Sequence, residues 1–306
     1  MIQTYLQPLP HGITLSCRAT GEPGRPVLLF LHGFPEAAFV WDELFTHFAQ
    51  PENGGYRCVA PNLRGFERSS SPAEVAAYRP KHLVQDIGAL ATLEADAGPL
   101  ACLVAHDWGG AVAWNLANQR PDCMERLAII NSPHPGTFLR ELRDSPRQQQ
   151  ASAYMNFLIR PDAEGLLAEN DYQRLWGFFS GWGRADWLTE EVKEQYRQVW
   201  NGPAGGPPGA GLTGGCNYYR ASPLRPPREG DPAAAAITLP PEMLRVTVPT
   251  LVLWGMQDVA LPPGLLEGLD DYVPRLQLEK VQDASHWIVH EQPRLVAARL
   301  RAFFAQ

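Results

Sequence analysis

The stretch that most constrains the fold is Ala-His-Asp-Trp-Gly-Gly at residues 105–110. An apolar run at residues 100–104 precedes it, and an alanine-rich run with helical spacing follows at residues 111–119. A strand, an abrupt turn and a helix, with small residues around the turn, are typical of a nucleophile elbow, whose usual pattern is Gly-x-Ser-x-Gly. The central residue here is Asp107. The pattern therefore predicts a carboxylate nucleophile, although an N-capping aspartate at an ordinary strand-to-helix turn would look the same in isolation.

Strands alternate with helices on both sides of this stretch. Apolar runs predict strands at residues 3–8, 13–19, 26–31, 58–60, 100–104, 126–131, 249–254 and 276–281. Helical spacing is found at residues 41–48, 80–96, 111–119, 188–200 and 293–304. Such alternation predicts an α/β protein with a parallel sheet and right-handed crossovers.

The alternation stops between residues 132 and 240, where helical or loop-like patterns rich in Trp and Tyr take over. We therefore predict a core domain formed by residues 1–133 and 240–306, and a helical cap domain at residues 134–239. Residues 201–240 are dense in Gly and Pro and are predicted to form a mobile linker.

Four candidate functional residues follow predicted strand ends, namely Phe34, Asp107, Asp258 and His286. In a parallel sheet, ligands bind beyond the carboxyl ends of the strands. These four residues should therefore meet at one edge of the sheet. The insertion begins and ends at the same edge, so we expect it to cover them.

Composition excludes several classes of function. The 306 residues carry a net charge of −7, with Lys and Arg scattered along the chain, which argues against a nucleic-acid partner. The sequence contains no apolar run near the length of a membrane span and does not begin like a secretory signal. The number of cysteines, five, is odd, and their spacings fit no metal site. This favours a protein that is kept in a reducing cytoplasm.

Six short motifs occur in order along the chain: His32-Gly-Phe-Pro35, Leu63-Arg-Gly65, His106-Asp-Trp-Gly109, Asn217-Tyr-Tyr-Arg220, Gly255-x-x-Asp258 and Ser285-His286. Together they resemble the epoxide hydrolase family of the α/β-hydrolase superfamily, over nearly the whole chain. The resemblance implies a mostly parallel eight-stranded sheet flanked by helices, with a helical cap inserted after the sixth strand. It also implies conversion of an epoxide to a vicinal diol, with no metal and no organic cofactor.

The order nucleophile, acid, histidine is that of an α/β-hydrolase triad. An aspartate carboxyl group, with a reference pKa of about 4, is ionised at neutral pH and can attack a saturated carbon directly, giving an ester. His286 would then activate the water that hydrolyses the ester, and Asp258 would orient His286. Asn131 ends the preceding strand but is not a carboxylate. His290 is expected to be a surface or helix-start residue.

The backbone N–H groups of Phe34 and Trp108 are expected to form the oxyanion hole. The side chains of Phe34, Trp108 and His106 are candidate substrate contacts, although a buried histidine such as His106 can equally be a scaffold group. The resemblance implies a cis bond between Phe34 and Pro35.

In the family, two cap tyrosines hydrogen-bond to the epoxide oxygen while the ring opens. Tyr219 matches through the Asn217-Tyr-Tyr-Arg220 motif, and Tyr154 matches through its spacing to Phe157 and Pro161. The adjacent Tyr218 is an alternative to Tyr219. Both matched tyrosines would equally suit the core of the cap.

Three alternative functions can be weighed against the sequence, and the serine esterase or lyase fails. A haloalkane or haloacid dehalogenase would use the same aspartate ester, but haloalkane dehalogenases commonly carry Asn at the position of Phe34. Haloacetate dehalogenases carry arginines near the nucleophile, where this chain has Trp108 and Ala111. A serine esterase or lyase would need a serine at position 107, and a non-catalytic ligand-binding module would be expected to lack part of the triad. The expected partners are a small apolar epoxide and water, and a homodimer is open.

Overall fold

The computed structural model describes residues 1–202 and 208–305, and it is built on one eight-stranded sheet of order β1-β2-β4-β3-β5-β6-β7-β8. The strands are β1 (Gln3–Pro8), β2 (Thr14–Thr20), β3 (Val27–Leu31), β4 (Arg57–Pro61), β5 (Cys102–His106), β6 (Leu127–Ile130), β7 (Thr250–Gly255) and β8 (Leu276–Val281). β2 is antiparallel to both β1 and β4, and β3 to β8 are parallel. The predicted eight-stranded, mostly parallel sheet is confirmed.

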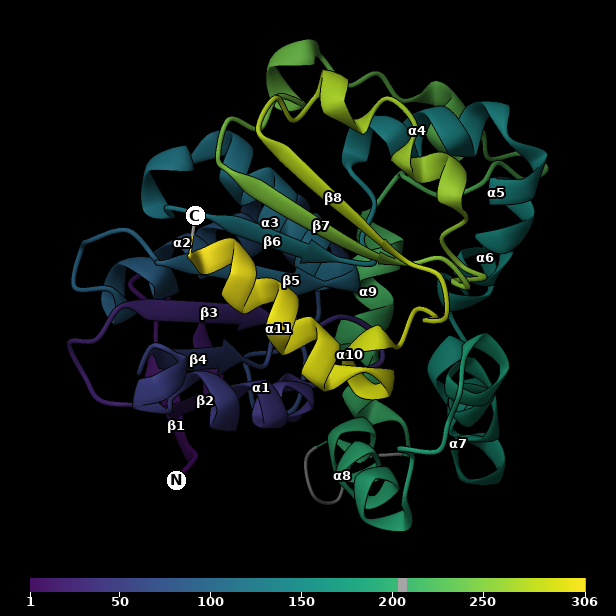
Figure 1. Cartoon of the computed structure of the whole chain (residues 1–306). Coiled ribbons are helices and arrows are strands. Elements are labelled where there is room, and N and C mark those ends of the chain that lie inside the picture. Colours follow the sequence, from purple (N-terminus) through teal and green to yellow (C-terminus); the bar gives the residue numbers. More distant parts are fainter. Residues whose placement is uncertain (203–207, 306) are drawn as a thin grey trace.

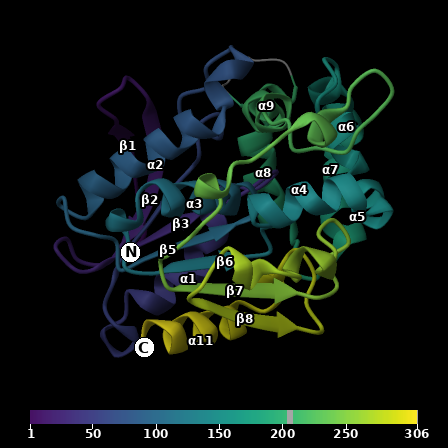
Figure 2. The same cartoon turned by 90° about the horizontal axis from the view of Figure 1, so that it is seen from above.

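Helices cover both faces of the sheet. The α-helices within residues 1–202 and 208–305 are α1 (Asp42–Phe48), α2 (Pro80–Glu94), α3 (Asp107–Gln119), α4 (Pro135–Asp144), α5 (Pro146–Ala151), α6 (Ala153–Leu158), α7 (Ala163–Trp182), α8 (Glu190–Asn201), α9 (Thr213–Ala221), α10 (Ile288–Glu291) and α11 (Pro293–Phe304). In Figure 1, α1 and α11 lie in front of the sheet, and α2 and α3 lie behind it. Figure 2 shows α4 to α9 gathered beyond the carboxyl ends of the strands.

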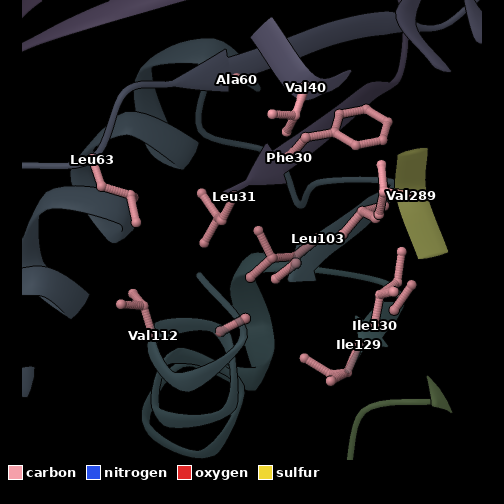
Figure 3. Packing of buried hydrophobic residues seen from close by; sticks show 14 of the residues in the cluster. Phe30, Leu31, Val40, Ala60, Leu63, Leu103, Val112, Ile129, Ile130 and Val289 are labelled. Carbon is pink, nitrogen blue, oxygen red and sulfur yellow. The ribbon is translucent and has the colours of Figure 1, made fainter. Parts of the chain in front are cut away.

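The central strands β3 and β5 are buried along their whole length. Successive side chains of a strand point to opposite faces of the sheet. Figure 3 accordingly shows Phe30 beside Val40 on one face, and Leu31 pointing to the other face, towards Val112 of α3. Complete burial of one such side chain contributes roughly 1.5–3 kcal/mol, so the layer that contains Leu31 and Val112 stabilises the packing of α3 on the sheet.

The insertion between β6 and β7 is helical, and the predicted linker at residues 201–240 is wrong for residues 210–221, which are helical. That segment contains α9, whose residues 214–219 are buried. The prediction is wrong here because Gly214 and Gly215, which are typical of linkers, serve a packing role in this helix. A Cβ at Gly214 would lie 2.2 Å from the carbonyl oxygen of Gly65, and one at Gly215 would lie 2.6 Å from the Phe34 ring. The glycines therefore let α9 pack directly on the core. Residues 203–207 of the predicted linker lie outside the described residues.

None of the helices in the described part of the chain combines the length and apolarity needed to cross a membrane.

Candidate active site

Asp107 is the first residue of α3, immediately after β5, and has a φ of 49°. The left-handed region is costly for a residue with a side chain and is tolerated where the surrounding structure enforces it. The small neighbours make this turn possible. A Cβ at Gly109 would lie 2.5 Å from the Leu31 carbonyl oxygen, and one at Gly110 would lie 2.3 Å from the Ser132 Cβ. The elbow therefore needs glycine at both positions in order to pack on β3 and on the end of β6.

The Asp107 carboxylate is held between a backbone amide and a histidine. The Phe34 N–H donates to Oδ1 at 2.7 Å, and Nε2 of His286 lies 3.7 Å from Oδ2. The hydroxyl of Ser132 donates to the Asp107 carbonyl at 2.7 Å, which fixes the turn itself. A Cβ at Gly33 would lie 2.1 Å from Oδ1, so the Phe34 amide can approach the carboxylate only because residue 33 is glycine.

His286 is oriented by Asp258, which follows β7. The Nδ1–H of His286 donates to Oδ2 of Asp258 at 2.7 Å, because a carboxylate can only accept. The Asp258 carboxylate also accepts the side-chain amide of Asn131 at 2.8 Å and the N–H groups of Ala260 and Leu261 at 2.9 Å. These bonds fix the histidine tautomer and direct Nε2 towards Asp107. Asn131, which the sequence set aside because it is not a carboxylate, supports the acid rather than replacing it.

The charges around His286 change its protonation. Burial lowers the pKa of His286, but the negative charge of Asp258 and then that of Asp107 outweigh the burial and raise the pKa to about 9. At neutral pH the imidazole is therefore protonated for as long as Asp107 is ionised. Loss of the Asp107 charge would lower the pKa of His286 again.

A second buried network lies behind the triad. His106 donates Nε2–H to the backbone carbonyl of His286 at 2.9 Å and faces Glu36 with Nδ1 at 3.1 Å. His290 contacts the other Glu36 oxygen at 2.5 Å, and the Tyr196 hydroxyl of α8 donates to that same oxygen at 3.2 Å. Burial raises the pKa of Glu36, but His290 and His106 outweigh it and hold the pKa well below its usual range.

This network changes two expectations. Both ring nitrogens of His106 are engaged and its side chain is buried, so the structure places it under the His286 loop and away from the cavity. His290 lies in the one-turn helix α10 with 11% of its side chain exposed, so of the two positions expected for it, at the surface or at a helix start, the surface position is wrong. Glu36 was missed altogether. The available signal was a carboxylate directly after the His32–Pro35 motif, where an exposed loop residue would look identical.

The three candidate tyrosines have different surroundings. The rings of Tyr154 (α6) and Tyr219 (α9) lie 6.0 Å apart. Burial, followed by neighbouring negative charge that includes Asp107, raises the pKa of both hydroxyls, so both remain protonated donors. The Tyr218 hydroxyl instead donates to the Arg64 carbonyl at 3.0 Å. Of the two adjacent tyrosines, Tyr219 is therefore the one directed at the Asp107 region.

Asp107, Trp108 and Tyr154 open on a cavity of about 200 Å³. The Phe34 ring is not part of its wall and packs edge-on against Tyr219 with ring centroids 5.5 Å apart. The amide of Trp108 lies at the N-terminus of α3, where backbone N–H groups have no intrahelical partner.

The Phe34–Pro35 bond is cis, as the resemblance implied. Within residues 1–202 and 208–305, no cluster of three or more His, Cys, Asp or Glu side chains is arranged to hold a metal ion.

The chain is similar to known proteins along nearly its whole length. The family model described as the alpha/beta hydrolase fold matches residues 26–293. The AB hydrolase superfamily protein YfhM of Bacillus subtilis is 36% identical over 94% of this chain and 92% of its own length. Epoxide hydrolase 4 of Mus musculus is 32% identical over 99% of this chain and 79% of its own length.

Solved structures extend the similarity to three dimensions. A structure described as a novel epoxide hydrolase from metagenomes of hot environments has a TM-score of 0.85 at 36% identity, covering 99% of this chain and 98% of the other. The epoxide hydrolase of Bacillus megaterium, in complex with an inhibitor, has a TM-score of 0.83 at 26% identity, covering 99% of this chain and 100% of the other. This chain is thus a member of the α/β-hydrolase superfamily. Within that superfamily it belongs to the epoxide hydrolase family.

Proposed function

We propose that this epoxide hydrolase opens its substrate through a covalent ester on Asp107 and then hydrolyses that ester with a water activated by His286. The observation that carries the proposal is the position of the Asp107 carboxylate. It sits at the elbow, 3.7 Å from a histidine that Asp258 orients, and it lines a largely apolar cavity. An ionised carboxylate needs no base to attack a saturated carbon.

In the proposed first step, one oxygen of Asp107 attacks a ring carbon and the carbon–oxygen bond of the epoxide breaks. The hydroxyl of Tyr154 or Tyr219 gives its proton to the leaving oxygen, because an alkoxide is a poor leaving group. The imidazolium proton of His286 then restores the tyrosine. Ester formation removes the Asp107 charge that helps to raise the pKa of His286, so the neutral imidazole needed next becomes favoured.

In the proposed second step, His286 takes a proton from water and the hydroxide adds to the ester carbonyl. The oxyanion is stabilised by the N–H groups of Phe34 and Trp108, and one such donor is typically worth about 3–4 kcal/mol. The Phe34 amide already donates to Asp107 at 2.7 Å. Collapse breaks the bond between the Asp107 carbonyl carbon and the product oxygen, and this oxygen takes the proton of the hydroxyl that was added, so the diol leaves with Asp107 ionised and His286 protonated, as at the start. We propose residues 134–239 as the cap that excludes bulk water during both steps.

The geometry favours epoxides over haloalkanes. The Tyr154 and Tyr219 hydroxyls remain protonated beside Asp107, which suits them to an oxygen leaving group. Phe34 offers an apolar ring where haloalkane dehalogenases commonly carry Asn. We therefore expect diol from styrene oxide and no halide from 1-chlorobutane. Halide release without turnover of styrene oxide would reverse this assignment.

The experiment that tests the covalent mechanism is one turnover in H₂¹⁸O with enzyme in excess. The label should enter the carboxyl group of Asp107 first, because water attacks the ester carbonyl and not the epoxide carbon. A labelled diol with unlabelled protein would contradict the scheme. A second readout is the mass of a tryptic peptide that contains Asp107.

The five cysteines are all free and buried. Unpaired thiols are typical of proteins kept in a reducing compartment. We therefore propose a cytoplasmic location.

A further inference from the structure

The cavity at Asp107 is elongated along one helix. One wall is the side of α3 formed by Trp108, Ala111, Val112 and Asn115. Asn115 lies eight residues from Asp107, which corresponds to about 12 Å along the helix axis. The facing wall comes from the start of α2 and from the segment before β7, with Leu83, Ile237, Leu239 and Met243 among its members. The cavity therefore runs from the nucleophile towards the outer end of α3.

The walls of this cavity offer almost no free polar group beyond Asp107 and Tyr154. Its other polar side chains already have local partners. Asn115 donates to the Ala111 carbonyl at 2.8 Å, and Ser132 donates to the Asp107 carbonyl at 2.7 Å. Ser222 accepts the Leu224 N–H at 3.2 Å. The binding of a hydrocarbon substituent in this cavity is therefore stabilised by burial against an apolar surface.

The opposite side of Asp107 is filled by aromatic rings. Trp182 lies with its ring centroid 5.0 Å from that of Tyr154 and 6.1 Å from that of His286. It stacks on Phe178 at 4.7 Å and on Trp287 at 6.2 Å. Among the described residues that line the cavity, neither Trp182 nor His286 appears. The space beyond the nucleophile on this side is thus occupied by protein.

We propose that this one-sided cavity binds a single elongated apolar substituent, so that the substrates are terminal epoxides carrying an unbranched alkyl chain or a flat aryl group on one ring carbon. Trp182 excludes a second large substituent on the other carbon. The inference rests on the epoxide hydrolase function proposed above and adds the substrate class and its determinants. Affinity for the substituent should grow with its length, by about fourfold per buried methylene, equivalent to about 0.8 kcal/mol.

The test compares kcat/KM for three epoxides: 1,2-epoxybutane, 1,2-epoxyoctane and trans-4,5-epoxyoctane. The two epoxyoctanes are isomers, so they differ in the placement of carbon and not in its amount. The natural enzyme should favour 1,2-epoxyoctane over its internal isomer at least a hundredfold, and over 1,2-epoxybutane at least tenfold. Equal turnover of the two isomers would overturn the proposal.

Two variants test which residues determine the preference for a single long substituent. Ala111→Phe places a ring in the cavity one turn after Asp107, and should lower the ratio of kcat/KM for 1,2-epoxyoctane to kcat/KM for 1,2-epoxybutane at least tenfold. Ala89→Phe, at a half-buried position of α2 outside the cavity wall, is the matched control and should leave this ratio unchanged. Trp182→Ala should raise kcat/KM for trans-4,5-epoxyoctane at least tenfold.

The outcomes separate the two proposals. Turnover of 1,2-epoxybutane shows that each variant is folded and hydrolyses an epoxide. If 1,2-epoxybutane is hydrolysed but Ala111→Phe leaves the preference for the longer chain intact, the cavity assignment is wrong and the function stands. If no epoxide gives diol with the natural enzyme, the proposed function itself fails.

Discussion

At the scale of single residues, the two proposed steps divide between Asp107 and His286, and one substitution should separate them. We expect His286→Gln to form the ester and then stall, because only the second step needs a base. Steady-state turnover should fall by about 10²–10⁴-fold, the typical contribution of a general base. Mass spectrometry after mixing with styrene oxide should detect an adduct on the peptide containing Asp107. Asp107→Asn is the control and should carry no adduct, and an unmodified His286→Gln enzyme would contradict the division.

The tyrosine hydroxyls should act on the first step. We expect Tyr219→Phe to slow formation of the ester in stopped-flow measurements by roughly tenfold to a hundredfold, less than the full effect of a general acid because Tyr154 remains. KM should change little. Tyr218→Phe is the matched control, since its hydroxyl donates to the Arg64 carbonyl and not to the cavity. A slower first step in Tyr218→Phe than in Tyr219→Phe would reverse their assigned positions.

The sequence predicted that Asp107, Asp258 and His286 lie close together, because each follows a predicted strand and a parallel sheet brings strand ends together. The sequence did not predict the contact between Glu36 and His290. Their meeting depends on how the loop after β3 folds over α10, and no periodicity along the chain encodes that contact. A buried carboxylate between two histidines is visible only in three dimensions.

At the scale of elements, α9 shows why a composition rule gave a wrong prediction. Gly and Pro usually weaken helices and mark linkers, and Gly214 and Gly215 fit that rule. In the structure their missing side chains are what allow α9 to touch Gly65 and Phe34 and to present Tyr219. The gain from close packing outweighs the low helix propensity, and such a gain depends on a partner segment that is far away in the sequence.

The close packing of α9 on Gly65 predicts the effect of adding a side chain at Gly214. Gly214→Ala should destabilise the protein by about 1–3 kcal/mol, the usual cost of overpacking, because its Cβ would lie 2.2 Å from a backbone oxygen that cannot rotate away. It should also slow ester formation, since α9 carries Tyr219. Gly177→Ala in α7 is the control, because a Cβ there meets no atom within 4 Å. Urea unfolding should show the control unchanged or stabilised by about 0.4–1 kcal/mol. Equal losses in the two variants would contradict the role of the contact.

At the scale of the whole molecule, the triad links stability to pH. The pKa of His286 is raised from 6.5 to about 9 in the folded protein, chiefly because the charges of Asp258 and Asp107 outweigh burial. A raised pKa means that the folded state binds the proton more tightly than the unfolded state does. The resulting stabilisation is fully present below pH 6.5 and is lost as the pH rises to 9. Its upper limit is about 3 kcal/mol, at 1.36 kcal/mol for each pKa unit.

Two other buried histidines act in the opposite direction and in a different pH range. Burial lowers the pKa of His32 and of His134 to about 4, so folding is opposed by their protonation only below pH 6.5. Between pH 6.5 and 9 the contribution of His286 should therefore be separable from theirs. We expect the free energy of urea unfolding of the natural protein to fall across this range, by up to about 3 kcal/mol. In His286→Gln the decline should be clearly smaller. Parallel curves for the two proteins would show that the Asp107–His286–Asp258 charges are not coupled to folding as the geometry requires.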